Sequence, residues 1–77
     1  MEHRDEIMKF FVEKGVAGDL KYEDDLFAGG YVNSLFALEI IVFLEKTFKI
    51  KIKNKEITEE NFRTINNIAE LVGRYVG

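Results

Sequence analysis

Hydrophobic residues recur at helical spacing near the start of the chain. Ile7, Phe10 and Phe11 fall on one side of a helix, while charged residues fill the opposite side. Gly15 and Gly18 follow, and glycine readily adopts the left-handed conformation that is common just past a helix C-terminus. The pattern therefore predicts an amphipathic first helix that ends at these glycines.

The most apolar segment, residues 34–48, lacks glycine and is rich in good helix formers, so it predicts a second helix. One face of this helix collects the positions that a core-facing stripe requires: Ala37, Ile40, Ile41, Leu44 and Phe48. The opposite arc holds Glu39 and Lys46, but it is also apolar through four further side chains: Leu35, Phe36, Val42 and Phe43. These four cannot all reach the same core.

The connection between the two helices, residues 16–33, has no sustained period. It nevertheless holds several large apolar side chains: Leu20, Tyr22, Leu26, Phe27, Tyr31 and Val32. A long structureless loop is unusual in a compact domain, so we expect this one to pack on the helices. After the second helix, Ile50 and Ile52 alternate with lysines and predict a brief extended segment whose isoleucines point inward.

Two threonines begin the remaining predicted elements. Thr58 precedes two glutamates, which is a favourable helix start, and predicts one short helical turn. Thr64 precedes a last helix whose apolar positions are Ile65, Ile68, Ala69, Val72 and Val76. The sequence thus predicts an all-α fold, a small bundle of three main helices plus a short fourth, with a long loop between the first two helices.

The length of 77 residues and the composition are those of one small globular domain, residues 1–77. The chain has no cysteine and only His3 as a histidine, so we expect no metal site and no catalytic residues. A net charge of −3 argues against nucleic acid as a partner. The N-terminal segment matches neither a signal peptide nor a membrane span. We expect a monomeric cytoplasmic protein.

The second apolar arc of the helix at 34–48 has two interpretations. In the first, the helix is central and neighbouring segments cover both of its sides; in the second, the arc is a docking patch for a partner protein. Aromatic side chains are enriched in interface cores, so the candidate docking residues are Leu35, Phe36, Val42 and Phe43, with Glu39 as a polar guide among them.

A spaced motif covers the start of this helix and the loop before it. Asp25-Leu26-Phe27-x-x-Gly30-x-x-Asn33-Ser34-Leu35 closely resembles the pattern D-x-F-x-x-G-x-x-D-S-L of phosphopantetheine-carrying acyl, aminoacyl and peptidyl carrier proteins. The resemblance continues in Leu38-Glu39, in Phe48-x-Ile50-x-Ile52, in residues 60–65 and in Ile68-Ala69-x-Leu71-Val72. It spans nearly the whole chain. The sequence of residues 32–37 is most similar to that of free-standing carriers of polyketide extender units, and D-alanyl and other aminoacyl carriers are alternatives.

The resemblance implies a right-handed four-helix carrier fold and a function. Ser34 resembles the serine that receives 4'-phosphopantetheine from coenzyme A, in a reaction catalysed by a phosphopantetheinyl transferase. The arm carries an acyl or aminoacyl group as a thioester, which a loading enzyme attaches and a downstream synthase or transferase uses. Asn33 caps the helix beside the site. The implied protein is a carrier rather than an enzyme, in fatty-acid, polyketide or nonribosomal-peptide biosynthesis.

The residues around Ser34 suit such a site for independent physical reasons. A helix N-terminus has free amides and a partial positive charge, which favour an attached phosphodiester by about 0.3–1 kcal/mol. The glycines before it permit positive φ and leave room for an approaching enzyme. A second hypothesis stays open, in which Asn33 and Ser34 are only cap residues and the apolar helix binds a partner without any prosthetic group.

The chain departs from the family pattern in its charges. Asn33 replaces the usual aspartate, which keeps the cap but removes a negative charge beside the serine. The second helix is apolar rather than strongly acidic, so we expect partner docking to weaken only modestly at raised salt. The lysines at 49, 51, 53 and 55 are expected to face solvent, with an acidic partner or the phosphates of coenzyme A as the alternative contact.

Overall fold

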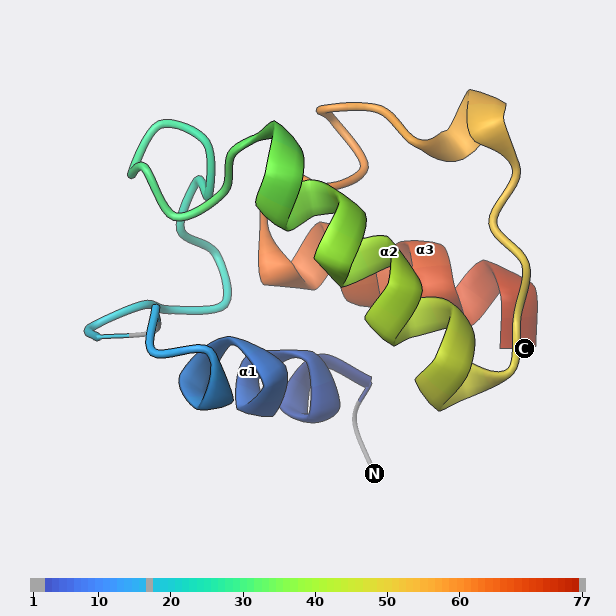
Figure 1. The fold of residues 1–77 in the computed structure, drawn as a ribbon, viewed down its shortest axis with the longest axis horizontal. Helices are drawn as coiled ribbons and strands as arrows, with labels where there is room; N and C mark the ends of the chain where they lie inside the picture. Colours follow the sequence, from blue (N-terminus) through green and yellow to red (C-terminus); the bar gives the residue numbers. More distant parts are fainter. Residues whose placement is uncertain (1–2, 17, 77) are drawn as a thin grey trace.

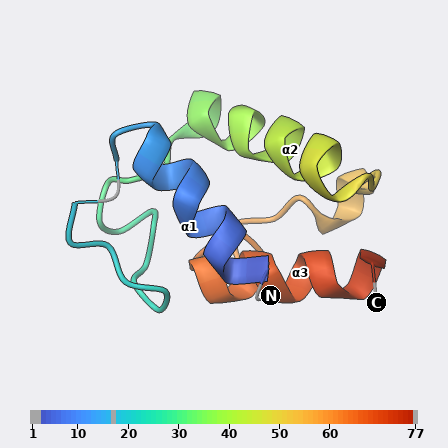
Figure 2. The ribbon, with the colours of Figure 1, turned by 90° about the horizontal axis from the view of Figure 1, so that it is seen from below.

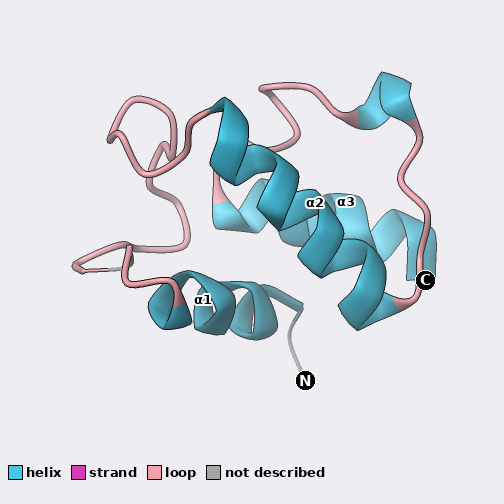
Figure 3. Ribbon diagram, in the orientation of Figure 1, coloured by secondary structure: helices cyan, strands magenta, loops and turns pink. Residues whose placement is uncertain are grey.

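The computed structural model describes residues 3–16 and 18–76, and over this range it is helical without any strand (Figures 1 and 3). Its elements are α1 (His3–Glu13), α2 (Ser34–Phe48), the 3₁₀ helix η1 (Asn54–Glu56) and α3 (Ile65–Val76). α1 packs extensively on α3, and α2 runs in the same general direction as α3 (Figure 2). The predicted all-α class and the three main helices are confirmed.

The short turn predicted at Thr58 is present, since the Phe62 amide donates to the Thr58 carbonyl at 3.2 Å, but it does not become a fourth helix. The Thr58 hydroxyl does accept a hydrogen bond from the Asn61 amide at 3.2 Å, but residues 59–62 form only turns. A single turn gains little from helix cooperativity, and the buried side chain of Phe62 directs the chain into the core instead. The described residues therefore hold three α-helices and a 3₁₀ turn, which lies earlier in the chain than predicted, in place of the four-helix fold that the resemblance implied.

The core lies where the three helices meet. Its fully buried members come from every α-helix and from the first loop: Ile7, Phe11, Leu26, Ile40, Leu44, Ile65, Ile68, Leu71 and Val72. Of the inward positions predicted for α3, Ile65, Ile68 and Val72 are buried and Ala69 is half-buried, whereas Val76 is 42% exposed. Val76 is the last residue of the helix, and it lies beyond the buried side chains.

The long loop before α2 packs on the rest of the protein as predicted. The Leu26 side chain is fully buried, and its amide donates to the Arg63 carbonyl at 2.6 Å. The Asn66 amide at the start of α3 donates to the Tyr22 carbonyl at 3.1 Å. Backbone hydrogen bonds thus join this loop to the start of α3 and to the segment that leads into it.

The segment after α2 is held in place from both sides. α2 ends at Lys49, which has a left-handed backbone with φ 58°. The Glu45 carboxylate accepts a hydrogen bond from the Ile52 amide at 3.0 Å, and the Tyr75 hydroxyl accepts one from the Lys53 amide at 3.0 Å. Ile52 is buried and Ile50 is half-buried, while the lysines are exposed, as the alternation predicted.

Candidate functional site

Ser34 is the first residue of α2, and its side chain is exposed. Asn33 precedes it with an extended backbone and caps the helix, because its Oδ1 accepts a hydrogen bond from the Phe36 amide at 2.8 Å. The cap predicted for Asn33 is present. Since Asn33 satisfies the Phe36 amide, the Ser34 hydroxyl is available for other chemistry.

The motif before Ser34 builds a closed loop that positions it. The Asp25 carboxylate accepts hydrogen bonds from the Phe27 and Ala28 amides at 3.0 and 2.9 Å. Gly30 has φ +77°, a conformation that favours glycine, and it turns the chain so that the Tyr31 amide reaches the Leu26 carbonyl at 2.9 Å. The spaced residues of the motif therefore have structural roles that bring Ser34 to the tip of the helix.

A groove of about 430 Å³ opens beside Ser34. Its walls come from the first loop, α2 and the segment after η1: Phe27, Asn33, Ser34, Ala37, Ile41, Ile57, Thr58, Glu59 and Phe62. Ser34 thus stands at a helix N-terminus, which favours a phosphodiester, next to a groove that is lined by apolar side chains together with Thr58 and Glu59. These residues fit a phosphopantetheine arm on Ser34, because the attachment point is both accessible and electrostatically favourable.

The outer arc of α2 is divided between solvent and α1. Leu35 is 71% exposed and Val42 is 53% exposed, as the docking interpretation requires. Phe36 and Phe43 are half-buried instead, because Phe10 of α1 stacks on both rings at centroid distances of 5.8 and 4.3 Å. Both interpretations of this arc therefore hold in part, each for two of the four side chains.

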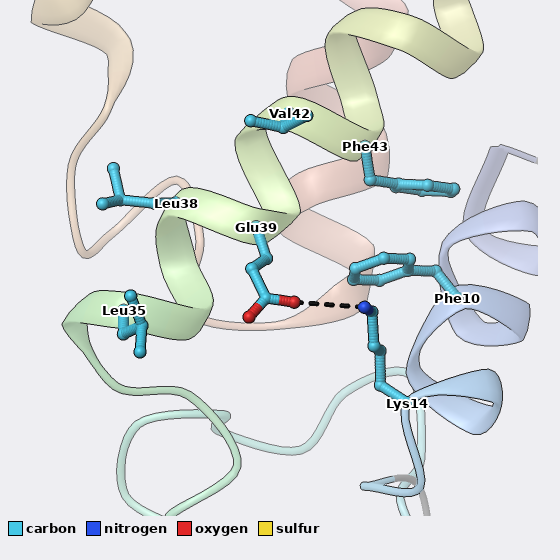
Figure 4. Close-up of a pocket in the computed structure, with 7 residues that line it drawn as sticks. All are labelled: Phe10, Lys14, Leu35, Leu38, Glu39, Val42 and Phe43. Carbon is cyan, nitrogen blue, oxygen red and sulfur yellow. Dashed lines mark ion pairs between the residues drawn. The ribbon is translucent and has the colours of Figure 1, made fainter.

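Leu35, Val42 and Phe43 border a groove of about 440 Å³ between α1 and α2, which is shown in Figure 4. Sequence reasoning missed three members of its lining, Phe10, Lys14 and Leu38, of which Leu38 is 61% exposed. Glu39 lies among the apolar side chains as predicted, and its Oε1 is 3.2 Å from the Lys14 Nζ (Figure 4). The exposure of Leu38 follows from its helical position next to Leu35 and Val42, and could have been found there.

Residues 3–16 and 18–76 contain no cluster of three or more histidine or carboxylate side chains placed to hold a metal ion. Within the same residues, no helix has the length and apolar character needed to cross a bilayer.

A small helical protein with an exposed serine at a capped helix start is the class of protein that the carrier resemblance predicted. The D-alanyl carrier protein of Streptococcus uberis is 42% identical over 52 residues, which cover 68% of this chain and 65% of that protein. The D-alanyl carrier protein of Streptococcus pyogenes serotype M5 is 38% identical over 48 residues, or 62% of this chain and 61% of that protein. The chain thus spans less than two thirds of the length of these relatives. The similarity confirms the predicted resemblance to phosphopantetheine-carrying carrier proteins.

Neither a protein-family model nor a solved structure matches this chain.

Proposed function

We propose that this protein carries an acyl or aminoacyl group as a thioester on a 4'-phosphopantetheine arm attached to Ser34. The observation on which the proposal rests is the exposed Ser34 side chain at the N-terminus of α2, beside the cap formed by Asn33. The names of the relatives, which are carrier proteins, support it. The protein itself catalyses no reaction in this proposal.

Attachment of the arm uses the Ser34 hydroxyl as the nucleophile. Its Oγ forms a bond to the β-phosphorus of coenzyme A, the pyrophosphate bond breaks, and adenosine 3',5'-bisphosphate leaves. The hydroxyl proton passes to a base on the separate phosphopantetheinyl transferase. The attached arm supplies the thiol that forms the thioester, and this chain has no cysteine to provide one.

The cargo and the partners are further parts of the proposal. The curated relatives are D-alanyl carriers, which supports an aminoacyl cargo over the extender units suggested by residues 32–37. A loading enzyme attaches the cargo, and a downstream synthase or transferase of a fatty-acid, polyketide or nonribosomal-peptide pathway removes it. We place the protein in the cytoplasm as a monomer.

Partner enzymes dock on the outer arc of α2 in this proposal. The exposed apolar side chains of Leu35 and Val42 make the contact, and Leu38 adds to them. Phe36 and Phe43 support the surface from the stack with Phe10, and Glu39 gives it one polar position. This apolar surface lies on the same helix as Ser34, so a docked enzyme has its reaction centre near the arm.

Intact-mass measurement tests the attachment. The chain is incubated with coenzyme A and a promiscuous phosphopantetheinyl transferase, with Ser34→Ala as the matched control. We expect one added arm on the natural chain and none on the variant, whose circular dichroism stays unchanged because Ser34 is exposed. Addition to both proteins moves the site elsewhere and overturns the role of Ser34.

A second candidate function is favoured by the exposure of Leu35, Leu38 and Val42. In this alternative, the protein is a helical interaction module that binds a partner through α2 without a prosthetic group. Failure of several different transferases to add an arm would support the module and contradict the carrier.

A further inference from the structure

A third hollow lies away from Ser34, between η1 and the end of α3. It has a volume of about 460 Å³ and is lined by Lys53, Lys55, Glu56, Arg74 and Tyr75. Figure 1 shows that the chain leaving α2 passes beside the end of α3 on the way to η1. The lining of this hollow shares no residue with the groove beside Ser34 or with the groove between α1 and α2, so it is a separate feature.

The charges around this hollow are mostly positive. Lys53, Lys55 and Arg74 are exposed, and Glu56 is the one carboxylate in the lining. The Glu56 Oε1 lies 3.5 Å from the Arg74 Nη2, so it orients the guanidinium while cancelling part of its charge. Two lysine charges remain in the lining after this pair is formed. The exposed Lys49 and Lys51 extend the positive surface along the same segment.

Hydrogen bonds fix the backbone of the hollow and leave donors for a ligand. The Tyr75 hydroxyl accepts a hydrogen bond from the Lys53 amide at 3.0 Å, which ties the segment after α2 to α3. Because the hydroxyl uses a lone pair in this bond, its proton can be donated to an anion. The Glu56 amide also donates to the Lys53 carbonyl at 2.9 Å, which closes the turn at η1.

We propose that this hollow binds a phosphate group. The residues that line this hollow carry two ammonium groups, one guanidinium and one hydroxyl, which match the several acceptor oxygens and the double charge of a phosphate monoester. A single carboxylate offers fewer acceptors and one charge, and it would leave part of this donor set without a partner. The phosphate belongs either to a free small molecule or to a lipid headgroup, and the two sources share the same chemistry at the hollow.

A titration of the unmodified chain with sodium phosphate at constant ionic strength tests the site, followed by ¹⁵N NMR. We expect the largest shifts at the amides of residues 53, 55, 74 and 75. The double variant Lys53→Gln/Lys55→Gln should weaken binding by about tenfold or more, because two charge-assisted hydrogen bonds are lost. The matched control, Lys9→Gln/Lys21→Gln, makes the same change of net charge at exposed positions elsewhere and should leave the affinity unchanged.

A third variant acts in the opposite direction. Glu56→Gln keeps the shape of the side chain but removes the charge that partly neutralises Arg74, so we expect it to strengthen phosphate binding by a few-fold. This gain does not depend on the double variant being folded. If both double variants weaken phosphate binding equally, or if the amide shifts are uniform over all lysines, the binding is general charge attraction and the proposed site is overturned.

Two further probes distinguish the source of the phosphate. Adenosine 3',5'-bisphosphate represents free phosphate monoesters, and vesicles of phosphatidylcholine with phosphatidic acid represent lipid headgroups, with pure phosphatidylcholine vesicles as the blank. Binding to either probe that is lost in Lys53→Gln/Lys55→Gln supports the hollow and assigns its source. No binding to phosphate or to either probe overturns it. Since no transferase is used, this outcome is independent of whether Ser34 accepts an arm.

Discussion

Asn33 allows the effect of the helix cap to be measured apart from the effect of a negative charge, because it caps α2 without the charge that the usual aspartate of the carrier motif would add. Its Oδ1 accepts the Phe36 amide at 2.8 Å, and Asn33→Ala removes this bond from the start of the helix. Loss of such a cap costs about 1 kcal/mol, with a range of about 0.5–2 kcal/mol. For a domain of this size, a loss of 1 kcal/mol lowers the melting temperature by about 4–8 °C.

Asn33→Asp should behave differently from the alanine variant. The carboxylate keeps an acceptor for the Phe36 amide and adds a negative charge at the positive end of the helix dipole. We therefore expect the unfolding free energy to stay the same or to rise by about 0.3–1 kcal/mol. The same change restores the aspartate of the carrier motif, so we expect faster arm attachment by a promiscuous transferase.

Urea denaturation and thermal melting by circular dichroism measure the stability of both variants, and initial rates of mass increase measure attachment. Thr47→Ala is a suitable control, because Thr47 is exposed on the same helix but far from its N-terminal cap. An alanine variant at position 33 that is as stable as the natural chain would refute the role of the cap. An aspartate variant with an unchanged attachment rate would refute the role of charge beside Ser34.

Three further predictions follow from burial, backbone conformation and charge. Leu44→Ala should lower the unfolding free energy by about 2–5 kcal/mol, because Leu44 is fully buried, whereas Leu38→Ala should change it by less than about 0.5 kcal/mol. Urea denaturation measures both variants, and similar losses of stability in the two would contradict the core described here. Gly30→Ala should destabilise the protein by about 1 kcal/mol, because the positive φ of this residue strains an alanine even though its Cβ would meet no atom within 4 Å. A melting temperature equal to that of the natural chain would exclude strain at this position. Binding of a loading enzyme should weaken only modestly between low and physiological salt, because Lys14 and Glu39, the charged residues that line the groove between α1 and α2, already pair with each other. A steep salt dependence in calorimetry would show that charges control docking.

The sequence predicted α2 accurately because its start and its interior carry clear local signals. Asn33 provides the cap and residues 34–48 lack glycine, whereas the left-handed conformation of Lys49 at the end of the helix is not one that its residue type predicts. The burial of the long first loop was also predictable, because its large apolar side chains needed a place in the core. Ser34 could be singled out as a candidate site only by comparison with carrier proteins, since cap residues of its type are common at helix starts.

Other features depend on tertiary contacts that a sequence pattern does not contain. The helical spacing of Phe36 and Phe43 placed them at the margin of an exposed arc, but the stack with Phe10 shelters both rings. Thr58 has the residue type of a helix start and makes the expected hydrogen bond, yet the burial of Phe62 stops the turn from growing into a helix. Local propensity was correct at these positions, and packing between distant segments determined the outcome.

α2 is 15 residues long, so Ser34 and Lys49, which follows the last residue of the helix, are separated by about 22 Å along the helix axis. A negatively charged resin or sensor chip that binds Lys49 and Lys51 therefore holds the protein by the end of α2 that lies away from Ser34. In that orientation the serine end faces the bulk liquid, and enzymes in the flow can reach it without a chemical tag.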